Sequence, residues 1–143
     1  LDAVAEHARG PLGDDVWGTD DDELAAVTLV ALARAGCATV ASWEADTGGA
    51  LLAALAAAPA MDGAARYLGG VLDGGGSAPA PVADACLQLS LLPQDAHGRS
   101  RVRVALSGGH VALPTAELRI HGSGPQRLRR AAFAALDHVR RSV

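Results

Sequence analysis

Residues 37–58 read CATVASW, EADTGG and ALLAALAAA in turn, and this stretch decides the fold. The first part, Cys37 to Trp43, is mostly apolar and rich in residues that favour strands. The last part, Ala50 to Ala58, is strongly helix-forming and is followed by Pro59. Between them, Thr47-Gly48-Gly49 supplies the residue types that a sharp change of backbone direction needs. This order predicts a strand, a glycine turn and a helix, a unit from which α/β domains are built.

The rest of the chain continues this alternation of helices and strands. A run of alternating polar and apolar residues at 101–106 is followed by Ser107-Gly108-Gly109, which predicts an antiparallel hairpin with the next strand. Further strands are expected at 66–72, 86–92 and 111–120, and helices at 20–35, at about 82–85 and after Ser123. We therefore expect a three-layer α/β/α domain whose mixed sheet has about five strands, one of them antiparallel.

The first 19 residues are expected to lie outside this domain, which we place at 20–143. Leu1 to Arg9 has helical spacing and is stopped by Gly10-Pro11, so it is interpreted as the end of a preceding helix followed by a linker. Because the chain begins with Leu1 rather than Met, we expect an N-terminal domain to precede it in a longer protein.

Composition sets limits on the partners and the cellular location. The 143 residues carry a formal net charge of −4, which argues against nucleic acid as a partner because such binding relies on clustered positive charge. No apolar stretch approaches the roughly 18 residues that a membrane span needs, so we expect no membrane partner. Two cysteines, Cys37 and Cys86, are too few and too distant for a disulfide framework or a zinc site, which favours a cytoplasmic location.

Lysine is absent from the sequence, where all 12 basic residues are Arg. The guanidinium group stays charged in proteins and cannot act as a proton-accepting base, so lysine-dependent chemistry is excluded. The five histidines show no metal-ligand spacing, and we expect neither a metal nor a cofactor.

The turn after the strand at 37–43 is the expected place for a ligand. Ligands of open α/β sheets bind beyond the carboxyl ends of strands, and a helix N-terminus offers free N–H groups. Glu44 and Asp46 could act as acids or bases, and Thr47 could cap the helix or donate its hydroxyl. An ordinary strand-to-helix turn has the same pattern, because Thr-Gly-Gly is a common tripeptide.

The frame Glu44-Ala45-Asp46-Thr47-Gly48-Gly49 resembles the Glu-Ser-Cys-Thr-Gly-Gly turn of the CinA C-terminal domain, the competence/damage-inducible family of nicotinamide-nucleotide amidohydrolases. Tyr67 to Leu72 resembles the Gly-Gly-Val strand of that family, and Leu128-Arg129 with the alanine-rich helix after it resembles the last helix. Residues 12–20 look like the linker that precedes the domain in full-length CinA. The resemblance implies a homo-oligomer with a mononucleotide ligand, held by Thr47, Gly48, Gly49, Gly69, Gly70 and Arg129.

The residues that would run the amidase reaction of that family are missing. Its serine looks like the nucleophile, and Ala45 stands at that position. The assisting tyrosine and lysine would fall near Gly74 and Pro79, and Leu91 to Gly98 replaces a glycine-rich stretch. The resemblance therefore implies a catalytically degenerate domain that acts as an interaction or regulatory module.

Two other functions stay open. The first is an active amidohydrolase on nicotinamide mononucleotide or a related nucleotide, which would use Thr47, Asp46 or Glu44 in place of the missing groups. The second is a nucleotide-binding module without catalysis.

Overall fold

The structure is a computed structural model that describes residues 21–73, 82–108 and 111–143, with only the backbone described for Asp21 and Asp22. In chain order, its elements are α2 (Asp21–Arg34), β1 (Thr39–Ala45), α3 (Ala50–Ala56), β2 (Arg66–Asp73), β3 (Ala85–Leu91), β4 (Ser100–Gly108), β5 (Leu113–Ile120) and α4 (Gly124–Ser142). The expected helix end and linker before residue 20 lie outside the described residues, as do Gly74 and Pro79.

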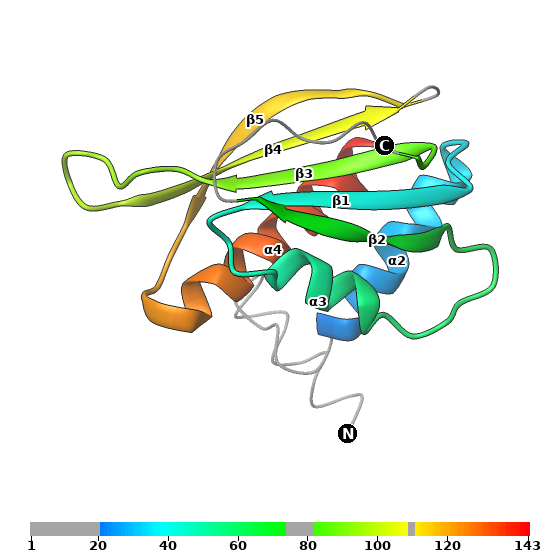
Figure 1. Ribbon diagram of the computed structural model, residues 1–143, viewed down its shortest axis with the longest axis horizontal. Helices are drawn as coiled ribbons and strands as arrows, with labels where there is room; N and C mark the ends of the chain where they lie inside the picture. Colours follow the sequence, from blue (N-terminus) through cyan, green and yellow to red (C-terminus); the bar gives the residue numbers. More distant parts are fainter. Residues whose placement is uncertain (1–20, 74–81, 109–110) are drawn as a thin grey trace.

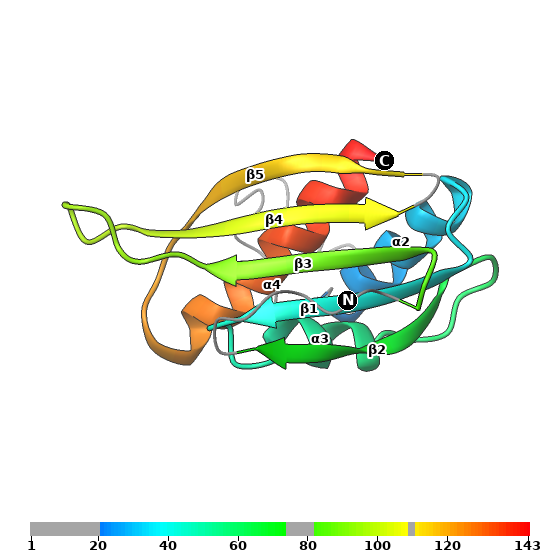
Figure 2. The same ribbon diagram turned by 45° about the horizontal axis from the view of Figure 1, so that its top comes forward.

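The five strands form one mixed sheet in the order β2-β1-β3-β4-β5 (Figure 2). Strand β1 pairs in parallel with β2 and with β3. Strand β4 is antiparallel to both of its neighbours, so it alone opposes the direction of the other four. This confirms the expected mixed five-stranded α/β sheet, its single antiparallel strand and the hairpin of β4 and β5.

The three described helices lie together on one face of the sheet (Figure 1). Helices α2 and α3 each contact α4 and also contact each other. The described helices therefore form a single layer against the sheet. Along β4 the side chains alternate: Val102 and Val104 are buried toward the helices, while Arg101 and Arg103 point to the opposite face.

The core between sheet and helices is built from small aliphatic side chains. Helix α4 buries Ala131, Ala132, Ala135, Leu136 and Val139 against the inward residues of the strands. Such small residues allow close packing of helices, and the Thr28 hydroxyl in α2 donates to Leu24 O at 2.7 Å and lies 3.3 Å from Leu136 O in α4. No helix in the described part of the chain is long and apolar enough to cross a membrane.

The segment before β3 corrects one expectation. The helix expected at 82–85 is wrong, because this segment is a bend that leads directly into β3. The Asp84 carboxylate accepts hydrogen bonds from the N–H groups of Ala38 (2.9 Å) and Thr39 (3.1 Å), and the Thr39 hydroxyl accepts the Asp84 N–H at 2.9 Å. These contacts join the starts of β1 and β3, so β1 begins at Thr39 rather than at the expected Cys37.

Candidate functional site

The turn between β1 and α3 lies at the carboxyl end of β1, where the sequence predicts a ligand. It runs from the last strand residue, Ala45, to the first helical residue, Ala50. Gly48 and Gly49 have φ angles of 63° and 81°, a left-handed conformation that explains the choice of glycine. Asp46 also has a positive φ of 60°, and aspartate is among the few other residues that tolerate this conformation.

Glu44 caps the start of α3 with its carboxylate. Its side chain is only 1% exposed. One oxygen, Oε1, accepts the Thr47 hydroxyl and the Leu51 N–H, both at 2.8 Å, and the other, Oε2, accepts the Leu52 N–H at 2.9 Å. A negative charge at this end of the helix is also favoured by the helix dipole. The described protein groups therefore occupy both oxygens of Glu44 and hold the Thr47 hydroxyl.

A small cavity of about 220 Å³ opens beside this turn. It is lined by Glu44, Asp46, Thr47, Gly48, Gly49, Leu72 and Asp73. Asp73 is brought here because it is the register partner of Ala45 at the end of the neighbouring strand β2. Leu72 closes one side against Gly49, while Leu91 and Leu92 are not among the lining residues. The cavity thus places two further carboxylates next to the turn.

A second hollow, of about 390 Å³, lies between α3 and α4 and shares Thr47 and Gly48 with the cavity. Its walls are mostly apolar and include Leu128 and Phe133. Arg129 lies on this wall, with its guanidinium carbon 5.5 Å from the centroid of the Phe133 ring, in cation–π geometry. The fold therefore brings Arg129 to the same hollow as Thr47 and Gly48, two of the other predicted binding residues.

Gly69 and Gly70 lie elsewhere, in the middle of β2. Gly70 pairs with Ser42, and Gly69 has a φ of 111° at an irregularity in the strand pairing. A methyl group on Gly70 would collide with Ser42 Oγ and would approach Tyr67 Oη to 2.8 Å. Packing therefore explains why residue 70 is a glycine. Neither Gly69 nor Gly70 lines the cavity beside the turn.

The hydrogen bond between Ser42 Oγ and Tyr67 Oη, 2.6 Å long, was not predicted from the sequence. Burial raises the pKa of Tyr67 above its ordinary value of 10.0, although the hydrogen bond with Ser42 opposes this shift. The phenol therefore stays protonated at neutral pH and cannot remove a proton from Ser42. This contact forms because β1 pairs with β2 and because Gly70 has no side chain to separate the two hydroxyls. A local sequence motif does not reveal which strands are paired.

Position 45 and the two cysteines are also poorly suited to nucleophilic catalysis. Ala45, at the position of the expected nucleophile, presents a methyl group and is 7% exposed. Cys37 and Cys86 are buried, and burial raises the pKa of both thiols, which disfavours the reactive thiolate. Among the side chains that the structure describes, no group of three or more His, Cys, Asp or Glu could hold a metal ion.

Comparison with known proteins gives a relative in structure. No protein-family model matches the chain, and no curated protein matches it. The solved structure of a competence-damaged protein (CinA) superfamily protein from Klebsiella pneumoniae superposes with a TM-score of 0.63 at 19% sequence identity. The match covers 85% of this chain and 96% of that chain. The chain therefore shares the fold of a CinA superfamily protein.

Proposed function

We propose that this chain is a CinA-like domain that has lost amidase activity and serves as an interaction or regulatory module. The proposal rests on the side chains at the β1–α3 turn, which lack the groups that an amidase needs. Ala45 offers no nucleophile, and the adjacent carboxylate of Glu44 accepts three hydrogen bonds as a helix cap. A carboxylate whose two oxygens are held in this way is not positioned to take a proton from a substrate.

The absence of lysine supports the same conclusion independently of any alignment. The amidase chemistry implied by the resemblance uses a lysine to assist the serine, and this chain has none at any position. Arginine cannot replace it, because the guanidinium does not lose its proton in proteins.

An enzyme with altered chemistry has less support. Attack by Thr47 would require a base, and the group that its hydroxyl contacts is Glu44. Both oxygens of this carboxylate also accept the N–H groups of Leu51 and Leu52, so it is already engaged as a helix cap. Asp46 is exposed and remains the one carboxylate of the turn free of such a cap, so it is the residue on which this alternative depends. An amidase that survives both Thr47→Ala and Asp46→Ala would rule out these roles.

Binding of a mononucleotide without catalysis is a second candidate, which the hollows at the turn favour. Together the cavity and the α3–α4 groove could hold polar and apolar parts of one ligand, with Arg129 on the wall of the groove. Asp46 and Asp73 would suit hydroxyl groups of a sugar better than a phosphate, because like charges repel.

Two measurements test these functions. Incubation of the purified chain with nicotinamide mononucleotide should release no ammonia beyond the rate in buffer, and turnover at the rate of an ordinary amidase would overturn the proposal. Nicotinamide mononucleotide at millimolar concentration should raise the melting temperature if the second candidate is right, because a ligand that binds only the folded state stabilises it. An unchanged melting temperature would remove that candidate and leave the first proposal intact.

A further inference from the structure

Positive charge is concentrated in one part of this acidic chain. Residues 99–130 contain seven Arg and a single acidic residue, Glu117, whereas residues 1–98 contain three Arg and fourteen Asp or Glu. A net charge of −4 for the whole chain therefore conceals a strongly basic segment. Such a segment attracts anions locally even on a protein that is negative overall.

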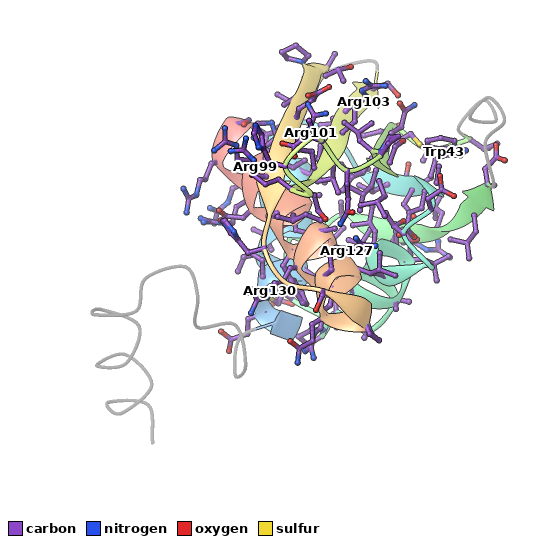
Figure 3. The ribbon with its side chains drawn as sticks, turned by 90° about the vertical axis from the view of Figure 1, so that its left-hand side faces the viewer. Trp43, Arg99, Arg101, Arg103, Arg127 and Arg130 are labelled. Carbon is purple, nitrogen blue, oxygen red and sulfur yellow. The ribbon has the colours of Figure 1, made fainter. Side chains whose placement is uncertain are left out.

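Three of these arginines meet on the face of the sheet that the described helices leave open. We define the arginine ridge as Arg101, Arg103 and Arg119, which lie on β4 and β5 around Glu117. In the antiparallel register Arg101 faces Arg119 and Arg103 faces Glu117. Figure 3 shows Arg101 and Arg103 in the upper half of the view, apart from Arg127 and Arg130 on α4 below them.

The ridge has fewer carboxylates than its guanidiniums need. Glu117 is shared by Arg101, at 2.9 Å, and Arg103, at 3.5 Å. Arg119 makes no ion pair with a residue that the structure describes, and the buried Nε of Arg101 makes no hydrogen bond. Two positive charges of the ridge are therefore not neutralised by described side chains.

The arginines of the ridge destabilise the sheet when no anion is bound to them. Like charges directly opposite each other in an antiparallel pair destabilise it, and Arg101 faces Arg119 in this way. The side chains are accessible, since Arg101 is 37% and Arg103 52% exposed. A planar guanidinium presents paired donors that match the oxygens of a phosphate group. A bound phosphate would relieve the repulsion that the protein leaves in place.

We propose that the arginine ridge binds a phosphate group, either as an inorganic phosphate or as part of a small phosphorylated molecule. The ridge lies near the functional turn without belonging to it: Arg103 faces Ser90 on β3, and Ser90 in turn faces Ala45 at the end of β1. The inference does not rest on the loss of amidase activity, because it concerns other side chains and is measured as binding.

Isothermal titration of the whole chain with inorganic pyrophosphate at low ionic strength provides the test. The double variant Arg101→Gln/Arg103→Gln should weaken binding by roughly tenfold or more, because it removes charge-assisted hydrogen bonds. Glu117→Gln should tighten binding, since it removes the carboxylate that competes for the same guanidiniums. The matched control is Arg34→Gln at the end of α2, an exposed arginine outside the ridge, which should leave the affinity unchanged.

A second readout separates a binding role from a structural one. Arg119→Gln should keep or raise the melting temperature, because it relieves the repulsion with Arg101, while it weakens binding of pyrophosphate. The proposal is overturned if pyrophosphate fails to bind at millimolar concentration, or if Arg34→Gln weakens binding as much as the ridge variants do. Titration with a nucleoside and its monophosphate then identifies the source: preference for the monophosphate supports a small phosphorylated molecule, and equal affinity for both overturns the role of phosphate. Much tighter binding of a single-stranded oligonucleotide would overturn the assignment to a small ligand.

Discussion

The Thr47 hydroxyl donates to Glu44 Oε1 at 2.8 Å, so a residue of the β1–α3 turn binds a residue near the end of β1. The same oxygen accepts the Leu51 N–H at 2.8 Å. Both residues were candidates for chemistry on a ligand, and the fold uses both to start a helix. A seven-residue helix gains little stability from its own hydrogen bonds, so its cap matters for the whole turn.

Replacement of Glu44 by Gln should lower the free energy of unfolding by about 2–3 kcal/mol, because the buried N–H groups of Leu51 and Leu52 lose a charged acceptor. Urea unfolding measures the change. Asp46→Asn is the matched control in the same turn, and it should stay within about 0.5 kcal/mol because the Asp46 side chain is exposed and asparagine also tolerates a positive φ. Equal losses for the two variants would contradict the capping role.

The elements of this fold are more predictable from sequence than the character of each face of its sheet. Helix α2 and the hairpin of β4 and β5 follow directly from apolar periodicity and from the glycines after Ser107. The character of each face depends on which strands lie side by side. Arg101 and Arg103 already indicate a polar outer face for β4, but Gln88 and Ser90 extend that face only once β3 is known to lie next to β4.

The place of the β1–α3 turn was predicted from the sequence, but its internal contacts were not. Local spacing puts Glu44, Asp46 and Thr47 close to one another, and all three line one cavity at the end of β1. It could not reveal that Glu44 caps a helix whose N–H donors are seven and eight residues further along the chain, because side-chain caps normally act over two or three residues. We expected Gly70 to bind a ligand. The sequence does not show that the side chain of Ser42, on the neighbouring strand, leaves no room for a larger residue at position 70.

Gly70→Ala should destabilise the fold by about 2–4 kcal/mol, since the added methyl group collides with Ser42 Oγ on the neighbouring strand β1. Gly98→Ala provides the comparison, because Gly98 has a φ of 72° with open space around its Cβ position and should cost only about 1 kcal/mol of backbone strain. Thermal unfolding of the two variants ranks these costs. A milder effect at Gly70 than at Gly98 would show that the strands separate easily at this point.

Tyr67 should titrate above its ordinary pKa of 10.0 in the folded protein and return to that value in urea, because burial disfavours the phenolate. It is the one tyrosine of the sequence, so the absorbance of the phenolate reports on it alone. A pKa that is higher in the folded state contributes stability that is present below pH 10.0 and is lost as the pH rises through the folded value. Unfolding at alkaline pH should therefore accompany ionisation, and a normal titration in the native protein would contradict the burial of this hydroxyl.

Asp95 should loosen the loop between β3 and β4 when it is protonated. Hydrogen bonds from the N–H of Arg99 (2.9 Å) and then from that of His97 (2.8 Å) hold the pKa of this carboxyl below its ordinary 3.8. Because the folded-state pKa is lowered, the stabilisation is present above pH 3.8 and is lost as the pH falls through the folded value. Hydrogen exchange at the amides of His97 and Arg99 should increase in acid and in Asp95→Ala at neutral pH. Asp62→Ala, at an exposed aspartate, should leave both amides protected as in the parent protein.

Ala45→Ser should not restore release of ammonia from nicotinamide mononucleotide. The Glu44 carboxylate would not serve the new hydroxyl as a base, because both of its oxygens are held by the helix cap. No lysine is present to remove the proton, and a serine hydroxyl is a weak nucleophile without a base. An ammonia assay, with the melting temperature as proof of folding, checks this outcome. Measurable turnover by Ala45→Ser alone would mean that a base other than lysine serves the turn, whereas turnover that requires the further change Pro79→Lys would support the loss of two groups from an amidase site.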